Sequence, residues 1–236
     1  MSEKNNKTVT LITGTRKGVG KYLVEHFVKQ GHLVVGCSRE SPNWKLANYT
    51  HFIADVSDEK QVRPIFSHIN SKLGRLDNLI NNAGITSMNH SLLTPIATVR
   101  KVIDTNIIGT FLFCQEAGRL MQRHGKGRIV NFSTVAVPIK LAGEAMYTAS
   151  KSAVEMLTRI LAKEYSDFGV TVNALGPSLI QTELISAISE DKLQALLANL
   201  TLKRFSTFED FSNLIDFFLK EESNSITGQV VYLGGI

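Results

Sequence analysis

Apolar residues occur along the chain in short continuous runs that alternate with longer segments in which they recur every three or four positions. The short runs are rich in β-branched residues and predict buried strands near 8–13, 33–37, 51–54, 76–81, 128–133, 170–175 and 229–233. The longer segments predict helices near 18–30, 58–73, 95–123, 147–167 and 208–221. This alternation predicts an α/β fold of the Rossmann type, a doubly wound, mostly parallel sheet of about seven strands with helices on both faces.

A single domain spanning 1–236 accommodates these elements, because no low-complexity linker or internal repeat divides the chain. A length of 236 residues is sufficient for one α/β domain with a sizeable core. Before the last predicted strand, the stretch 182–207 predicts short inserted helices. We expect this stretch to form a lid over a substrate site.

Three glycines lie where the first predicted strand meets the first predicted helix, in the segment G14-T-R-K-G18-V-G20. A glycine-rich turn between a strand and a helix lets the backbone approach a pyrophosphate, whose charge then lies at the helix N-terminus. The spacing is G-x-x-x-G-x-G and differs from the G-x-G-x-x-G of the standard dinucleotide fingerprint. The segment predicts a dinucleotide site, with an ordinary glycine-rich connection as the alternative.

Tyr147 and Lys151 lie one helical turn apart in the segment Y147-T-A-S-K151, and residues at this spacing share a helix face. A free phenol has a pKa of about 10, and a cation held beside it lowers that pKa by favouring the phenolate. The pair therefore predicts a general acid with an electrostatic helper. Alone it is a weak signal, because such pairs also arise by chance.

Other motifs accompany the pair in a fixed order: N81-N-A-G84 ends one predicted strand, Asn106 follows a helical stretch, and Ser133 and Thr134 end another strand. With them the chain resembles the short-chain dehydrogenase/reductases, whose pattern is T-G-x-x-x-G-x-G, N-N-A-G, a mid-chain Asn, a Ser and Y-x-x-x-K. The resemblance extends from Thr8 to Gly235. It implies an oxidoreductase that transfers hydride between a nicotinamide cofactor and a carbonyl or alcohol carbon.

The resemblance implies a catalytic set made of Asn106, Thr134, Tyr147 and Lys151. In this scheme Thr134 and Tyr147 hydrogen-bond the carbonyl oxygen, and Tyr147 gives the proton. Lys151 binds ribose hydroxyls, lowers the pKa of the phenol and connects through water and Asn106 to solvent. Counting back from Tyr147 places Thr134 where the family has a serine. Ser133 is the alternative if a one-residue bulge shifts the register, and either hydroxyl can instead bond to backbone at a strand end.

The end of the second predicted strand decides between NAD(H) and NADP(H). NAD-binding proteins of this architecture place an acid there, whereas an Arg accommodates a 2′-phosphate. Here Ser38 occupies the acidic position and Arg39 follows, while Glu40 lies one residue too far along to replace the acid. Lys17 resembles the second basic residue of NADP(H)-dependent family members, so we expect NADP(H).

Further cofactor contacts follow from the resemblance. Asp55 resembles the family's adenine-contacting Asp, with a helix cap before 58–61 as the alternative. The segment 173–182 resembles the one beside the nicotinamide, although Ser178 replaces the usual Gly after Pro177 and puts the local backbone geometry in doubt. The full implied set is Gly14, Arg16, Lys17, Gly18, Val19, Gly20, Ser38, Arg39, Asp55, Val56, Asn82, Ala83, Gly84, Tyr147, Lys151, Pro177, Ile180 and Thr182.

The C-terminal third is most similar to bacterial 3-oxoacyl-[acyl-carrier-protein] reductases, which implies a 3-oxoacyl thioester substrate, linked to acyl-carrier protein or CoA. Two features depart from that pattern. Phe168 stands where those enzymes commonly carry a basic residue that holds the acidic carrier, and L233-G-G-I236 replaces the closing V-D-G-G. The alternatives are a reductase of another small carbonyl, sugar or polyketide-type ketone, and a non-catalytic cofactor-binding protein.

Composition excludes several other classes. The net charge of +5 and the isoelectric point near 9.2 come from scattered Lys and Arg without a basic stripe, so we expect no nucleic-acid partner. No apolar segment is long enough for a signal core or membrane span, so we expect a cytoplasmic protein without membrane contacts. Cys37 and Cys114 are interpreted as reduced core thiols, and no metal site is expected.

Two of the predicted helices, 95–123 and 147–167, carry more apolar residues than contact with one sheet requires. The residues in question are Phe111, Leu112, Phe113, Ala117, Ala153, Met156, Leu157, Ile160 and Leu161. Family members pair these helices with symmetry mates. We therefore expect a homotetramer, or a homodimer, in which the last strand adds a further interface; the alternative is that these residues face the chain's own sheet.

Overall fold

The computed structural model describes residues 7–180, 194, 197–198 and 200–236. Thr182 and much of the predicted lid lie outside these residues. The described part confirms the predicted class, an α/β fold with a single sheet of seven strands in the order β3-β2-β1-β4-β5-β6-β7. All neighbouring strands are parallel. Their bounds are β1 (Val9–Thr13), β2 (Leu33–Ser38), β3 (Tyr49–Ile53), β4 (Asn78–Asn81), β5 (Gly127–Phe132), β6 (Val170–Gly176) and β7 (Val230–Tyr232).

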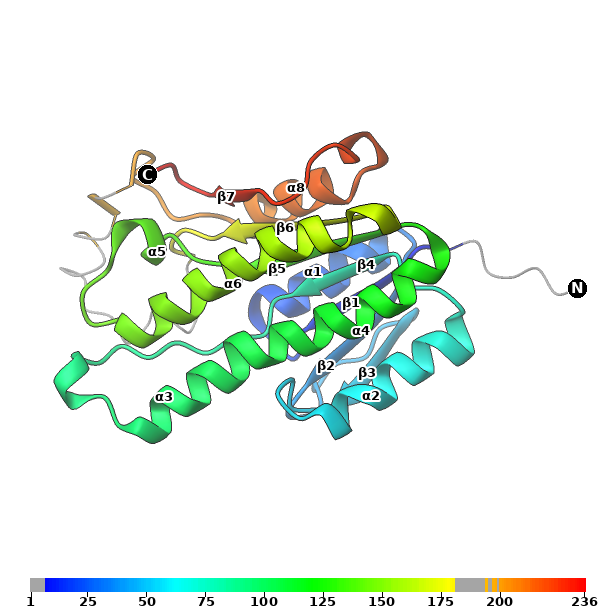
Figure 1. Ribbon diagram of the computed structural model, residues 1–236, viewed down its shortest axis with the longest axis horizontal. Helices are drawn as coiled ribbons and strands as arrows, with labels where there is room; N and C mark the ends of the chain where they lie inside the picture. Colours follow the sequence, from blue (N-terminus) through cyan, green and yellow to red (C-terminus); the bar gives the residue numbers. More distant parts are fainter. Residues whose placement is uncertain (1–6, 181–193, 195–196, 199) are drawn as a thin grey trace, which may run out of the picture.

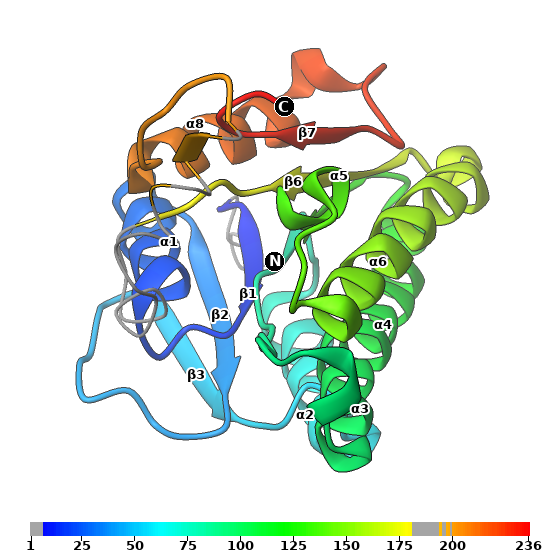
Figure 2. The same cartoon turned by 90° about the vertical axis from the view of Figure 1, so that its left-hand side faces the viewer.

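Helices cover both faces of the sheet, as Figure 2 shows most clearly. One face carries α1 (Gly18–Lys29) and α8 (Phe208–Leu219), and the other carries α2 (Glu59–His68), α4 (Gly109–His124) and α6 (Ala145–Glu164). Successive strand residues point to opposite faces. Leu11 of β1 therefore packs in the core cluster of the second helix group, and Ile12 packs in that of the first. Burial on both faces explains why the strands appear as continuous apolar runs.

The long helix predicted over 95–123 contains an irregularity. Regular helix α3 (Ile96–Ile103) is joined to α4 through a π-helical turn, η3 (Asp104–Ile108). A second π-helical turn, η1 (Ile69–Leu73), extends α2. Such turns frequently occur at functional sites, and η3 holds Asn106 in a fully buried position.

Several short helical segments were not predicted as separate elements. The short helix α5 (Ala136–Ile139) and the 3-10 turns η2 (Ser91–Leu93), η4 (Ser166–Phe168) and η5 (Glu221–Ser223) are too short to show a periodic pattern. Helix α6 begins at Ala145, two residues before the predicted start, so Tyr147 lies in its first turn. These differences leave the predicted topology intact.

The strand order locates the site. Strands β2 and β3 lie on one side of β1, and β4 to β7 lie on the other, so the direction of winding reverses between β1 and β4. Ligands of open α/β sheets bind outside the carboxyl ends of the strands at such a switch point. These ends lie on the left in Figure 1.

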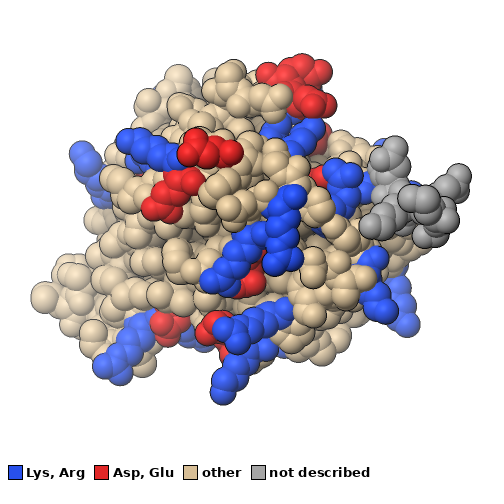
Figure 3. Space-filling model, turned by 45° about the vertical axis from the view of Figure 1, so that its right-hand side comes forward, with Lys and Arg blue, Asp and Glu red and all other residues tan. Residues whose placement is uncertain are grey.

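The distribution of charged residues and the burial of the two cysteines agree with what the sequence predicts. On the face in Figure 3, Lys and Arg lie in separate small groups, several of them beside Asp or Glu. Cys37 and Cys114 are buried and unpaired, and burial raises the pKa of each thiol to about 12, which confirms their interpretation as core thiols. Within the described residues, no helix has the length and apolar character needed to span a bilayer.

Candidate active site

The glycine turn between β1 and α1 has the conformation that its sequence predicts. Gly14 and Gly18 have φ values of 75° and 59°, in the left-handed region that favours glycine. A side chain at Gly20 would place its Cβ 2.1 Å from the carbonyl oxygen of Gly14. The side-chain amide of Asn82 stabilises the turn, because its Nδ2 donates to the carbonyls of Thr13 at 2.8 Å and Gly14 at 3.2 Å. The N-N-A-G segment after β4 therefore fixes the shape of the turn.

A cavity of about 220 Å³ opens beside this turn at the carboxyl ends of β1 and β2. Its walls include most of the residues predicted to contact the adenosine half of a dinucleotide. The predicted residues among them are Gly14, Arg16, Lys17, Ser38, Arg39, Asp55, Val56, Ala83 and Gly84; Glu40, Ala54, Ile85 and Thr105 complete the wall. The sequence motifs thus converge on one charged cavity, although they are far apart along the chain.

Hydrogen bonds hold the end of β2 in this cavity. The Ser38 hydroxyl donates to the carbonyl of Glu40 at 2.8 Å and lies 3.2 Å from Nε2 of His51. The Glu40 carboxylate pairs with Arg16, so it points back to the glycine turn. Arg39 is exposed at the cavity wall between these two residues. The carboxylate typical of NAD-binding proteins is absent at Ser38, as the sequence indicates.

Asp55 also lines this cavity. Burial acts to raise the pKa of its carboxyl, but hydrogen bonds from the hydroxyl and the backbone N–H of Ser57, with the charge of Arg39, bring this pKa below its usual value. Asp58 caps α2 through the N–H of Lys60. The alternative interpretation of Asp55 as the helix cap is therefore wrong.

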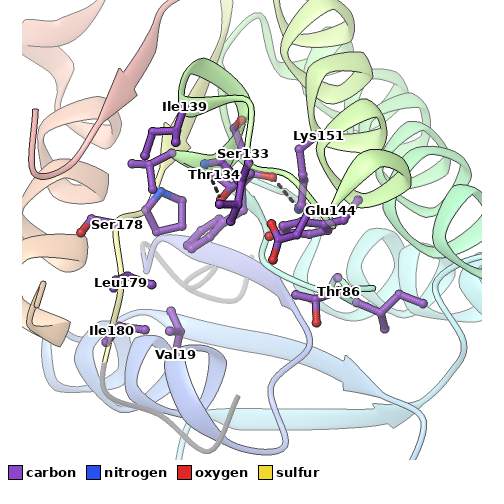
Figure 4. Close-up of a pocket in the computed structure, with 18 of the residues that line it drawn as sticks. Val19, Thr86, Ser133, Thr134, Ile139, Glu144, Lys151, Ser178, Leu179 and Ile180 are labelled. Carbon is purple, nitrogen blue, oxygen red and sulfur yellow. Dashed lines mark hydrogen bonds between the residues drawn. The ribbon is translucent and has the colours of Figure 1, made fainter. Parts of the chain in front are cut away.

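A second cavity, of about 250 Å³, lies farther along the strand ends (Figure 4). It adjoins the first through the shared wall residues Gly84 and Ile85. Most of its lining is apolar. The predicted site residues that line it are Val19, Asn82, Gly84, Thr134, Tyr147, Lys151, Pro177 and Ile180.

Tyr147 and Lys151 enter this cavity from the first two turns of α6. Burial raises the pKa of Tyr147 to about 12; a hydrogen bond with Thr134 opposes this shift, and the charge of Glu144 adds to it. Burial also lowers the pKa of Lys151 to about 8, and its Nζ donates to the carbonyl of Phe132 at 2.7 Å. The prediction that Lys151 lowers the pKa of the phenol is therefore wrong for this structure, because desolvation dominates and the ammonium group is directed to a backbone carbonyl.

The structure separates the roles of the two candidate hydroxyls. Ser133 donates to the buried carboxylate of Glu155 at 2.5 Å, and the same carboxylate oxygen accepts from Tyr232 at 2.6 Å. Thr134 is the hydroxyl that contacts Tyr147. Ser133 thus ties β5 to α6 and β7, while Thr134 faces the phenol in the position that ungapped counting predicts.

Asn106 holds the loop after β4. Its Nδ2 donates to the carbonyl of Ile85 at 2.9 Å and to the Ser150 hydroxyl at 3.0 Å, and its Oδ1 accepts from the Ile85 N–H at 2.9 Å. A Cβ at Gly84 would lie 3.3 Å from both Oδ1 of Asn106 and Nζ of Lys151. Glycine at this position therefore lets the chain pass between these groups. The proton connection through Asn106 stays a prediction.

The segment after Pro177 accommodates its unusual serine. Ser178 has no positive φ, so the doubt about its backbone geometry does not apply. The carbonyl of Pro177 accepts from the N–H of Val135 at 3.1 Å, which ties this segment to the end of β5. Ile180 lies on the cavity wall, and Thr182 falls outside the described residues.

Several wall residues were not identified from the sequence. The apolar ones include Met88, Val135, Leu141, Leu200 and Phe211, which come from separate loops and helices and share no motif. Glu144 was also missed. It is the N-cap residue before α6, outside the regular helix, so helix spacing from Tyr147 gave no signal for it.

The adjoining cavities fit the two halves of a nicotinamide dinucleotide. The charged cavity lies at the glycine turn and the N-terminus of α1, which suits phosphates. The other cavity places a phenol, a hydroxyl and a lysine where a substrate would meet the nicotinamide. The fold and the site therefore define a dinucleotide-dependent oxidoreductase acting on CH–OH or C=O groups.

Comparison with known proteins specifies the family. The model of the short chain dehydrogenase family matches residues 8–193. The chain belongs to this family, the short-chain dehydrogenase/reductases, as the motif order indicated. The predicted similarity to 3-oxoacyl-[acyl-carrier-protein] reductases is also confirmed, as two such relatives show. FabG of Staphylococcus aureus is 32% identical over 95% of this chain and 96% of its own, and FabG of Escherichia coli is 27% identical over 96% of each.

Solved structures share the fold. A short chain dehydrogenase from Leptospira borgpetersenii with bound NAD⁺ superposes with a TM-score of 0.89 at 25% identity, covering 99% of this chain and 93% of its own. ElxO with NADP bound superposes with a TM-score of 0.87 at 32% identity, covering 96% of this chain and 97% of its own. Structures of this kind thus contain either dinucleotide, so the fold alone does not choose between them.

Proposed function

We propose that the protein reduces a ketone to a secondary alcohol with NADPH, and that its substrate is a 3-oxoacyl thioester linked to acyl-carrier protein or CoA. The observation that carries the proposal is the contact of Tyr147 with Thr134 in the mostly apolar cavity, which adjoins the charged cavity beside the glycine turn. The similarity to 3-oxoacyl-[acyl-carrier-protein] reductases along almost the whole chain supports it.

The residues have distinct tasks in this reaction. NADPH, when bound, supplies the hydride. The hydroxyls of Thr134 and Tyr147 hold the carbonyl oxygen and stabilise its charge as it becomes alkoxide-like. With a pKa of about 12, the Tyr147 phenol keeps its proton until this charge develops and then donates it. Lys151 is oriented by the Phe132 carbonyl to bind ribose hydroxyls, and Asn106 fixes Ile85 beside the nicotinamide position.

The preference for NADPH rests on the wall of the charged cavity. Ser38 replaces the acid that would repel a 2′-phosphate, and Arg39 and Lys17 supply positive charge next to it. In addition, the carboxylate of Glu40 is paired with Arg16, which reduces its repulsion of a phosphate.

The substrate class is supported by the lining of the second cavity, whose apolar walls suit an acyl chain better than a sugar. One feature favours a different small ketone as the second candidate. Phe168 packs against the hydrophobic core at the position where a basic residue commonly holds the carrier protein, so this contact with an acidic carrier is lost. A non-catalytic role is the remaining alternative, although Thr134 retains a hydroxyl beside Tyr147.

In a steady-state assay of NADPH oxidation, we expect a higher kcat/KM with an acetoacetyl thioester than with any simple ketone or sugar in a panel. A higher value for another ketone would favour the second candidate. Binding of NADPH without turnover of any panel member would favour the non-catalytic role.

We further propose that the protein forms a homotetramer, or a homodimer, through α4 and α6. These helices lie side by side on one face (Figures 1 and 2). Some of the apolar residues predicted for an interface are instead buried in the chain's own core, as the alternative expected: Phe113, Ala117 and Leu161. Phe111, Met156 and Ile160 are exposed, at 39%, 54% and 46%. β7 forms an edge of the sheet and offers a further surface.

The second prediction concerns this assembly. Light scattering at micromolar concentration is expected to give a multiple of the 26.1 kDa chain mass. Ile160→Lys should lower the mass, because it places a charge in the proposed interface. Phe217→Lys, at a similarly exposed apolar position on α8, is the matched control and should leave the mass unchanged. A fully active wild-type monomer would contradict the proposal.

A further inference from the structure

Glu144 is a buried carboxyl group in the substrate cavity. It immediately precedes α6, and only 6% of its surface is exposed. Figure 4 shows its carboxyl pointing into the cavity. Within the described part of the chain, this carboxyl makes no hydrogen bond or ion pair. Because the carboxyl faces the cavity and has no partner among the described residues there, it is free to hydrogen-bond a group that arrives with the substrate.

The surroundings of Glu144 favour the neutral acid. The described cavity wall is formed by α1, the loop after β4, the segment from β5 to α6, α6 itself, residues 177–180, Leu200 and α8. Of these described elements, only α6 contributes other titratable groups, Tyr147 and Lys151. The amino group of Lys151 is directed to Phe132, and burial raises the pKa of the Glu144 carboxyl. A neutral carboxyl has an O–H that can donate a hydrogen bond.

The position of Glu144 relative to Tyr147 indicates what it would contact. Glu144 is the N-cap residue three positions before Tyr147, both side chains line the same cavity, and a charge on Glu144 is near enough to raise the pKa of the Tyr147 phenol. A ketone held by Tyr147 and Thr134 therefore has the Glu144 carboxyl on one side. A substrate with a second carbonyl separated from the ketone by one carbon would bring an acceptor oxygen to that side.

We propose that Glu144 is a specificity-determining residue, whose carboxyl in its neutral form donates a hydrogen bond to the second carbonyl oxygen of a 1,3-dicarbonyl substrate. This rests on the proposed function and deepens it, because a 3-oxoacyl thioester is one such substrate. A carboxylate that binds an ammonium-bearing ketone is the competing role. It is less favoured, because a charge on Glu144 raises the pKa of Tyr147 and needs a cation that the described cavity wall does not direct to it.

The test compares wild type, Glu144→Gln and Glu144→Leu on two substrates of equal chain length. Ethyl 3-oxobutanoate carries the second carbonyl, and heptan-2-one lacks it. We expect Glu144→Leu to lower kcat/KM for ethyl 3-oxobutanoate by about tenfold, the size of one hydrogen bond, and to leave heptan-2-one within about twofold. Glu144→Gln retains an N–H donor and should stay close to wild type on both substrates.

A pH series gives a readout that a merely structural role would not change. The carboxyl loses its donor proton as the pH rises through its raised pKa. The wild-type preference for ethyl 3-oxobutanoate over heptan-2-one should therefore fall with rising pH, whereas that of Glu144→Gln should stay constant. Lys151 titrates near pH 8 in both proteins, so its effect cancels in this comparison. If Glu144→Leu fails to fold, the pH comparison decides the question.

Binding separates this inference from the proposed function. Calorimetric titration of the NADP⁺ complex with ethyl 3-oxobutanoate involves no turnover. Weaker binding in Glu144→Leu but not in Glu144→Gln supports the inference even if wild type reduces neither ketone, which would overturn only the proposed function. The inference is overturned if Glu144→Leu affects both substrates equally, if wild type does not bind the dicarbonyl, or if Glu144→Gln is as impaired as Glu144→Leu. It is also overturned if wild type prefers 1-aminopropan-2-one and Glu144→Gln loses that preference.

Discussion

Replacement of Tyr147 by Phe should lower the rate of carbonyl reduction by about 10²- to 10⁴-fold, the usual contribution of a positioned proton donor. The phenol lies in the cavity against Thr134, and burial raises its pKa to about 12. Removal of its oxygen leaves the alkoxide with one hydroxyl contact and no proton source beside it. NADPH binding should persist, because the charged cavity is unaffected. Single-turnover kinetics and a separate fluorescence titration of NADPH will measure the two effects.

Tyr165→Phe is the matched control for this experiment. Tyr165 lies at the other end of α6, and burial likewise raises the pKa of its phenol to about 12. Its hydroxyl donates to the carbonyl of Cys114 at 3.4 Å and does not line the substrate cavity. The control removes the same atom from a partly buried tyrosine and should retain the wild-type rate. Near wild-type turnover by Tyr147→Phe would show that another group supplies the proton.

The strands could be predicted from the sequence because helices bury both faces of the sheet. Leu11 and Ile12 of β1 are both fully buried, on opposite faces, so the strand appears as an uninterrupted apolar run in the sequence. The π-helical turn at Asn106 was not predictable, since a single irregular turn within a long helix is too short to show a periodic pattern of its own. Helix α5 is four residues long and contains Pro138, so it carries no periodic signal.

The candidate site was predictable where the chemistry depends on backbone geometry. The glycines of the turn have the positive φ and the close contacts that their spacing requires. Electrostatics was less predictable. Spacing along a helix identifies Lys151 as a neighbour of Tyr147, but the pKa of the phenol depends on its burial in a cavity whose wall also includes residues of other elements, such as Val135 and Leu141. Glu144 was missed for the same reason, because its burial is a property of the folded cavity.

Arg39→Ala should weaken NADPH binding by about 1.5–3 kcal/mol, or roughly 10- to 150-fold, the range for a hydrogen bond to a charged group. Arg39 is exposed at the wall of the charged cavity, next to Ser38, whose hydroxyl is held by the Glu40 carbonyl. NADH lacks the 2′-phosphate, so its dissociation constant should change by less than about twofold by the same reasoning. Fluorescence titrations of both dinucleotides will measure the difference.

Net charge must be separated from direct contact in this measurement. Lys29→Ala removes one positive charge from the exposed end of α1, opposite the end that meets the glycine turn, and should leave the affinity for both dinucleotides unchanged. Salt provides a second criterion. Because the cavity is open to solvent, the loss in Arg39→Ala should shrink as ionic strength rises and the Debye length falls from about 10 Å at 0.1 M to about 3 Å at 1 M. Equal losses for NADPH and NADH would instead mean that Arg39 supports the shape of the cavity, and the preference for the phosphorylated dinucleotide would then depend on Lys17 and on the absence of a carboxylate at Ser38.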